Sequence, residues 1–140
     1  MAYTAAALAA LTATELRAAL EAGEFSAVDC AQALLARVDE VDPQVQAWAT
    51  LDPRHLLKQA AVADEARAHG LPLGPLHGLP VGLKDIIDTA DLPTEDGTVL
   101  HAGRTPRVDA PPVRRLRAAG GLGMGKTVTT EPATYAPGQT

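Results

Sequence analysis

The sequence has very little serine, cysteine or lysine, and the first two shortages each exclude a class of site. Among the 140 residues the only serine is Ser26, so the chain holds no serine-rich loop and no pair of serines for nucleophilic catalysis. The only cysteine is Cys30, which excludes an internal disulfide and fits a reducing compartment. Because Cys30 falls on an expected helix with no histidine nearby, we expect a buried structural thiol rather than a nucleophile.

Large apolar anchors and strong positive charge are scarce as well. Aromatic residues make up 3% of the chain, so we expect a core of alanine, leucine and valine. A net charge of -5 disfavours binding of nucleic acid, and no apolar run is long enough to cross a bilayer. The N-terminal stretch has no basic residue before its apolar part, so we expect no secretory signal and a cytoplasmic protein.

Histidine and arginine give no sign of a metal or cofactor site. The four histidines are scattered, so neither a metal nor a cofactor is expected, and a turn-forming role is favoured for His77. Arginines gather late in the chain, and we interpret them as a solvated helix face with its approach loop. They are Arg104, Arg107, Arg114, Arg115 and Arg117.

Helix start signals dominate the first half of the chain. Thr12 and Glu15 have the spacing of a capping box, Ser26 is a second cap, and Asp52 precedes Pro53. We therefore expect helices over residues 13–22, 26–43 and 53–68, the second closed by Pro43, and a short extended segment over 45–51.

The second half alternates between turn-rich connections and short apolar runs. Glycines and prolines between residues 71 and 82 predict a shaped connection rather than an element. We then expect a strand over 81–87, a loop over 88–106 with an extended piece at 98–100, a helix capped by Asp109 and ending at Gly120, and a strand over 122–128. Strand, helix and strand in this order predict parallel pairing.

Lys84 draws attention because it lies inside the apolar run from Val81 to Ile87. On a strand, Lys84 and Asp85 point to opposite faces, so one of them must find its partner elsewhere. A desolvated Lys84 could lose its proton near neutral pH and act as a base. If Lys84 instead ends an edge strand, its stem lies along apolar surface and its ammonium lies in water.

The residues around Lys84 also carry a family resemblance. Leu76-His77-Gly78-Leu79-Pro80-Val81-Gly82-Leu83-Lys84-Asp85 resembles the lysine motif of the amidase signature family, serine hydrolases that cleave carboxamides. The likeness continues in consistent order through Asp88-Thr89-Ala90, the Asp109-Ala110 helix start, Leu116-Arg117-Ala118-Ala119-Gly120 and Gly125-Lys126-Thr127-Val128-Thr129-Thr130-Glu131. The last of these segments looks more like stand-alone amidases than like the tRNA-dependent amidotransferase subunit.

The resemblance implies that Lys84 is the base of a Ser-Ser-Lys triad. In this scheme Lys84 takes a proton from a bridging serine, which in turn activates the nucleophilic serine. Both serines of the family lie in a Gly/Ser-rich loop after the Gly-Lys-Thr segment, and this sequence stops at Thr140 before such a loop. The chain would therefore carry only the lysine and be inactive alone, and the alternative is a non-catalytic truncated or helper fragment.

The expected fold is α/β, with N-terminal helices packed on the first strands of a mixed sheet, an incomplete amidase-signature fold. Residues 1–140 would form a single N-terminal part of an amidase domain, helical over 1–70 and carrying the lysine motif over 71–140. When completed, such a part would act on a small carboxamide. A second copy or a complementing chain would be its partner, and neither nucleic acid nor a membrane is expected.

A second motif competes with this interpretation. Gly120 to Thr127 matches the phosphate-loop pattern G-x-x-x-x-G-K-[ST], which would make the chain a nucleotide binder. A phosphate loop needs a strand before it and a helix after it, whereas here an expected helix precedes and Pro132 closes a β-branched run that follows. Under the family resemblance the same letters form a helix cap, a strand and a Gly-Lys-Thr turn, in which Gly121 and Gly123 weaken the strand.

Overall fold

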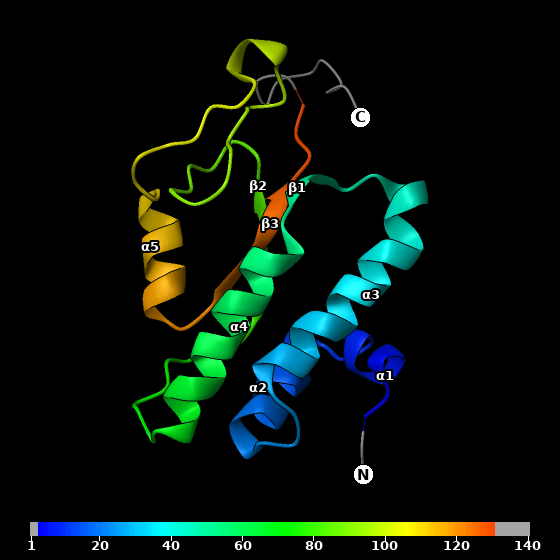
Figure 1. Cartoon of the computed structure of the whole chain (residues 1–140), viewed down its shortest axis with the longest axis vertical. Helices are drawn as coiled ribbons and strands as arrows, with labels where there is room; N and C mark the ends of the chain where they lie inside the picture. The colour runs from blue at the N-terminus through cyan, green and yellow to red at the C-terminus, as the bar shows by residue number, and fades with distance from the viewer. Residues whose placement is uncertain (1–2, 131–140) are drawn as a thin grey trace.

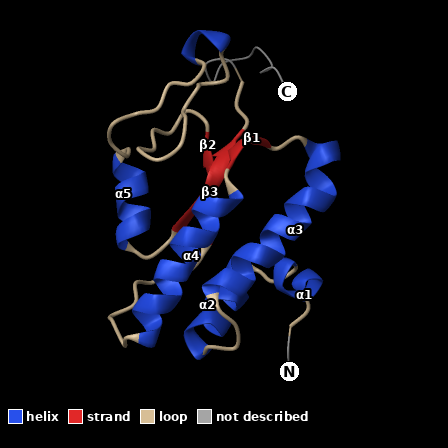
Figure 2. Ribbon diagram, viewed as in Figure 1, coloured by secondary structure: helices blue, strands red, loops and turns tan. Residues whose placement is uncertain are grey.

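The computed structural model describes residues 3–130, which form helices around a small sheet (Figures 1 and 2). The helices in this part are α1 (Ala5–Ala9), α2 (Ala13–Ala22), α3 (Ala27–Val45), α4 (Pro53–Ala68) and α5 (Pro111–Ala118). The strands are β1 (Trp48–Leu51), β2 (Pro80–Lys84) and β3 (Leu122–Thr127), and Val99–His101 forms the 3-10 turn η1. Within the described range, no helix is both long and apolar enough to cross a bilayer.

β3 is the central one of the three described strands, although it follows β1 and β2 in the chain. It pairs antiparallel with β1 and parallel with β2, which gives the order β1-β3-β2. The parallel pairing expected for the second half and the mixed sheet are thereby confirmed. Because β1 comes from the helix-rich first half, both halves of the chain contribute to one sheet.

The main core lies between the sheet and helices α2, α3 and α4. Leu20, Cys30, Leu56 and Met124 belong to one buried cluster that joins these elements. In the view of Figure 1, α5 lies to the left of the sheet and α3 to its right, with α1 and α2 at the bottom. The long connection from β2 to α5 occupies the upper left, beside the ends of β2 and β3.

The predicted helix starts are confirmed by their caps. Thr12 and Glu15 form a capping box at the start of α2, and Gly23 ends that helix at a φ of 74°. Ser26 caps α3, and Asp52 caps α4 by accepting two backbone hydrogen bonds. α1 is an addition that the sequence analysis did not predict, because its alanines show no periodic pattern.

Pro43 does not close α3, so that prediction is wrong. The helix continues to Val45 and ends at Gln46, whose φ of 51° is left-handed. The Gln46 backbone N–H still donates to the Asp42 carbonyl oxygen at 2.7 Å. Pro43 lies in the last turn, where its missing N–H removes only one helical hydrogen bond.

Three boundaries in the second half also differ from their predictions. β2 ends at Lys84 rather than at residue 87, because the Ile87 N–H turns back to donate to the Lys84 carbonyl oxygen at 2.9 Å. The expected extended piece at 98–100 is the 3-10 turn η1. Asp109 does not cap α5, because its carboxylate instead accepts hydrogen bonds from the Ala90 N–H and from Arg117.

Residues 120–127 do not form a phosphate loop. α5 ends at Ala118, Gly120 turns at a φ of 88°, and Gly125 to Thr127 continue β3. The Gly-Lys-Thr turn expected from the family resemblance is therefore wrong as well, and the nucleotide-binding alternative loses its structural basis.

Candidate active site

Lys84 is the last residue of β2, at the same end of the sheet as the end of β3. Its register partner on β3 is Thr127, and its side chain is exposed. β2 is an outer strand of the sheet, so the structure matches the second of the two expected placements, an edge lysine with its ammonium in water. In parallel sheets, ligands commonly bind beside the loops at the carboxyl ends of the strands, and Lys84 lies at such an end.

Asp85 follows Lys84 and points to the buried side, as the strand alternation predicted. The residue is 2% exposed, and its carboxylate accepts the Glu95 N–H at 3.2 and 3.3 Å. Its backbone N–H donates to the Thr127 carbonyl oxygen, and its carbonyl oxygen accepts the Asp96 N–H, both at 2.9 Å. Asp85 thus joins the end of β2 to β3 and to the connection that follows β2.

The partner that Asp85 finds elsewhere is Lys126 on β3. The Lys126 Nζ lies 3.6 Å from an Asp85 carboxylate oxygen, and the Lys126 side chain is fully buried. Burial raises the pKa of Asp85 and lowers the pKa of Lys126, and the attraction between the two charges counters both shifts. The sequence did not predict this pair, although a lysine inside the expected strand 122–128 indicated that its side chain could be buried.

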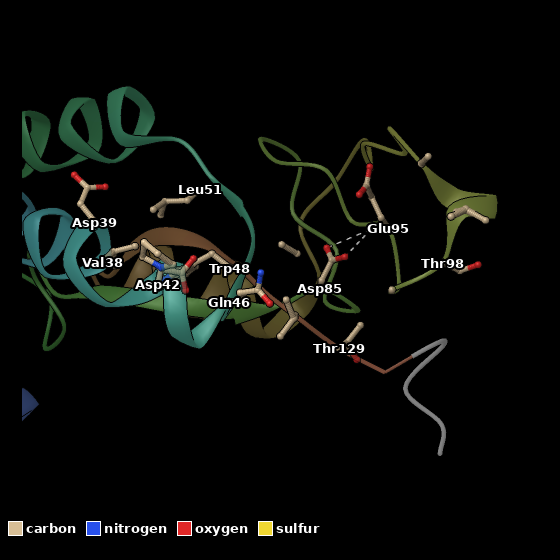
Figure 3. Close-up of a pocket in the computed structure, with 16 residues that line it drawn as sticks. Val38, Asp39, Asp42, Gln46, Trp48, Leu51, Asp85, Glu95, Thr98 and Thr129 are labelled. Carbon is tan, nitrogen blue, oxygen red and sulfur yellow. Dashed lines mark hydrogen bonds between the residues drawn. The ribbon is translucent and has the colours of Figure 1, made fainter. Parts of the chain in front are cut away.

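A pocket of about 830 Å³ opens on the Asp85 side of this end of the sheet (Figure 3). The end of α3, β1, the segment around η1, and residues 128–129 line it. In Figure 3, Asp39 and Asp42 lie on one side of the pocket and Asp85 and Glu95 on the other. Asp85 belongs to its lining and Lys84 does not.

Three of the four acidic side chains that line the pocket, those of Asp42, Asp85 and Glu95, accept backbone hydrogen bonds. Asp42 accepts the Ala47 N–H at 2.7 Å, and Glu95 accepts the Gly103 N–H at 2.6 Å. In the described part of the chain, no group of three or more histidine, cysteine, aspartate or glutamate residues is arranged to hold a metal ion. These three carboxylates of the pocket thus hold the backbone of the segments beside it.

The late arginines are only partly a solvated face. Arg117 donates to Asp91 at 2.6 Å and to Asp109 at 2.9 Å, so it ties α5 to the connection after β2. Arg104 pairs with Asp88 through both of its terminal nitrogens. Cys30 is fully buried, as predicted for a structural thiol, and burial raises its pKa to about 11.

Known proteins agree with the resemblance seen in the sequence. The Amidase family model matches residues 29–139. Over 120 residues the chain is 44% identical to a glutamyl-tRNA(Gln) amidotransferase subunit of Salinispora arenicola, a match that covers 86% of this chain and 24% of that protein. The structure of native peptide amidase from Stenotrophomonas maltophilia is similar at a TM-score of 0.81 and 39% identity, covering 87% of this chain and 25% of that one.

A vestigial protein complex related to the origins of an s-triazine catabolic enzyme also contains a similar chain. Its TM-score is 0.82 at 29% identity, over 86% of this chain and 27% of that one. The chain thus spans about a quarter of the length of the proteins it matches. They include both a peptide amidase and an amidotransferase subunit, so the expected likeness to stand-alone amidases stays a prediction. Because the family model matches most of its length, the chain belongs to the Amidase family.

Proposed function

We propose that this chain supplies the general base of a hydrolase that cleaves the C–N bond of small carboxamides. The observation that carries the proposal is the placement of Lys84, exposed at the end of a parallel strand in a chain of the Amidase family. Lysine suits the role because it can give up its proton when its ammonium is desolvated, whereas arginine stays protonated. Further protein packed over the edge strand β2 would provide that desolvation.

In the proposed reaction a neutral Lys84 accepts the proton of a bridging serine. That serine then takes the proton of the nucleophilic serine as its oxygen attacks the amide carbonyl, and the amine leaves with a proton returned along the same path. The chain contributes the lysine alone. Its binding groups for the carboxamide would lie on the polypeptide that also brings the two serines.

Ser26 does not serve as either of these serines. Its hydroxyl accepts the Asp29 N–H at 2.9 Å and donates to the Asp29 carboxylate at 2.7 Å, so it is engaged in capping α3. α3 rises about 28 Å over its 19 residues before it leads into β1 (Figure 1). The first residue of β1, Trp48, pairs with Thr127, which is also the register partner of Lys84. We therefore propose that the serines come from the remainder of a complete amidase or from a complementing chain.

A chimeric enzyme tests the role of Lys84. Residues 1–140 would replace the matching quarter of the Stenotrophomonas maltophilia peptide amidase, and ammonia release from peptide amides would be measured. Lys84→Ala should lower kcat by about a thousandfold or more, because removing one triad member costs several orders of magnitude. Lys84→Arg should be equally inactive.

The matched control is Lys58→Ala, which removes an exposed lysine from α4 and should leave kcat unchanged. Circular dichroism would show that each variant keeps its helices. An active Lys84→Arg chimera would refute the neutral-base role. Turnover by the 140-residue chain alone would refute the view that the serines come from elsewhere.

A further inference from the structure

The ammonium of Lys126 lies in a cage of oxygen atoms, buried away from solvent. It donates to the Ile87 carbonyl oxygen at 2.9 Å, to the Pro93 carbonyl oxygen at 3.2 Å and to the Thr94 hydroxyl at 2.6 Å. The Asp85 carboxylate is the fourth oxygen group, at 3.6 Å. All four come from residues 85–94, the first part of the connection that leaves β2, so one side chain of β3 holds this part together.

The three close acceptors match a protonated Lys126. A protonated lysine has as many N–H donors as the cage has close acceptors, whereas a neutral amine would turn its lone pair toward an oxygen. The Thr94 hydroxyl in turn points its own hydrogen toward the Ile87 carbonyl oxygen, at 3.5 Å. The buried Asp85 carboxylate supplies the balancing negative charge.

Two residues of this cage, Asp85 and Ile87, are connected to the backbone of Lys84. Asp85, next to Lys84, is held by Lys126, by the Glu95 N–H and by the Thr127 carbonyl oxygen. Ile87, whose carbonyl oxygen accepts from Lys126, donates its own N–H to the Lys84 carbonyl oxygen at 2.9 Å. A change at Lys126 can therefore reach the Lys84 backbone by two routes. One runs through Asp85, the next residue in the chain, and the other through Ile87 and its hydrogen bond to the Lys84 carbonyl oxygen.

We propose that Lys126 is a positioning residue for Lys84: its buried ammonium, with Asp85, fixes the turn after β2 and so sets where the Lys84 side chain leaves the sheet. The relevance of this role to catalysis rests on the function proposed for Lys84. The positioning itself is a property of residues 84–96 and 126, and it can be measured in this chain without the two catalytic serines of the proposed triad.

Two threonines of the same connection provide a matched test. Thr94 and Thr89 are both fully buried, but only the Thr94 hydroxyl contacts Lys126, whereas the Thr89 hydroxyl donates to the Leu92 carbonyl oxygen at 3.2 Å. Thr94→Val and Thr89→Val each remove one buried hydroxyl with little change of shape. Lys126→Met removes the charge and keeps most of the side-chain volume.

The measurement is amide hydrogen exchange by NMR on the 140-residue chain, read at Asp85, Ile87 and Asp96. Thr94→Val and Lys126→Met should speed exchange there by at least about tenfold relative to the Cys30 amide inside α3, because the opening is local. Thr89→Val should leave that ratio unchanged. A merely structural role would speed exchange at all four amides together.

The second readout is the Lys84 side chain itself. Exposed Lys84 and Lys58 can be tagged by reductive methylation with labelled formaldehyde, while fully buried Lys126 is protected. Thr94→Val should shift the methyl signal of Lys84 and leave that of Lys58 in place. If Lys126→Met fails to fold, the comparison of the two threonine variants decides alone.

The proposal is overturned if Thr94→Val and Thr89→Val change exchange at Asp85, Ile87 and Asp96 equally, or if the Lys84 signal is the same in both. In the chimera, Thr94→Val should lower kcat about tenfold or more with KM unchanged, because a displaced base affects the chemical step. An active Lys84→Ala chimera would refute the proposed function and leave the exchange result standing, so the two failures are distinguishable.

Discussion

Cys30 and Lys126 are both fully buried, but their surroundings differ in polarity. Cys30 lies in the apolar cluster between α3 and its neighbours, where a weakly polar thiol needs no partner. Lys126 requires an acceptor for each of its N–H groups and finds them on one loop. Burial alone therefore says little about the role of a polar side chain, and the groups that contact it are more informative.

The thiol of Cys30 gives a pH dependence of stability with a defined sign. Burial raises its pKa from 9.0 to about 11, so between these values the folded chain keeps a proton that the unfolded chain loses. The free energy of unfolding should therefore fall as the pH rises through this window, by at most about 1.4 kcal/mol per pH unit.

Urea unfolding of the wild type and of Cys30→Ala across that window would measure the effect. The difference between the two free energies should shrink as the pH rises, since other titrating groups are common to both chains. A difference that stays constant would show that the Cys30 thiol ionises equally easily in the folded state.

At the residue scale the sequence predicted part of the site. Alternation on a strand placed Lys84 and Asp85 on opposite faces, and the structure confirms it. The partnership of Asp85 with Lys126 was not predictable in this way. The oxygens of the cage come from residues 85–94, and only the turn after β2 brings them to β3.

The glycines of β3 show how an element can depend on the absence of side chains. A Cβ atom on Gly125 would lie 2.7 Å from the Thr50 carbonyl oxygen, closer than real Cβ contacts, and 3.0 Å from the Trp48 ring, which is unusually tight. A Cβ atom on Gly123 would meet nothing closer than 3.7 Å, at the end of the flexible Arg117 side chain. The glycines of this strand are thus required at one position and dispensable at another.

Gly125→Ala should lower the free energy of unfolding by about 1 to 3 kcal/mol, because β1 must move away from β3. Gly123→Ala is the matched control and should change it by less than about 1 kcal/mol, with a gain expected from the stiffer chain. Urea unfolding followed by the fluorescence of Trp48, the only tryptophan, measures both. Equal losses in the two variants would contradict the close approach of β1 at Gly125.

Elements with local start signals were predicted well, and elements without them were not. The capping residues of α2, α3 and α4 act within a single turn, so the sequence alone locates these helices. The end of β2, the turn η1 and the cap of α5 depend on distant partners. Asp109, for example, is drawn from its expected cap position by Ala90 and Arg117.

The whole molecule leaves apolar side chains exposed near the end of the sheet. Val99 is 71% exposed and its neighbour Leu100 is 85% exposed, both on η1. Val45 and Val62 are also exposed, at 63% and 58%, but they stand on two different helices. Adjacent apolar residues form a surface to which other apolar groups bind, and isolated ones do not.

We expect Val99→Glu combined with Leu100→Glu to reduce binding of the dye ANS and self-association of the 140-residue chain, with the free energy of unfolding changed by less than about 1 kcal/mol. Val45→Glu combined with Val62→Glu adds the same charge and should have a much smaller effect. Dye fluorescence and size-exclusion chromatography at several concentrations would compare the two pairs. Similar reductions would mean that total charge, and not the η1 surface, controls association.

At this scale the sequence predicted the fold class and the mixed sheet, because the order of strand, helix and strand restricts the topology. It did not predict the pairing of β1 with β3. Those two strands lie about seventy residues apart in the chain, and no local pattern links them.

The central position of β3 has a consequence for the order of events during synthesis. β1 and β2 leave the ribosome before β3, yet within residues 3–130 they share no ladder with each other and pair only with β3. The helices of the first half can therefore form early, while β1 and β2 stay unpaired until β3 has been translated. A nascent chain that stalls before residue 122 would have those helices and no sheet for them to cover.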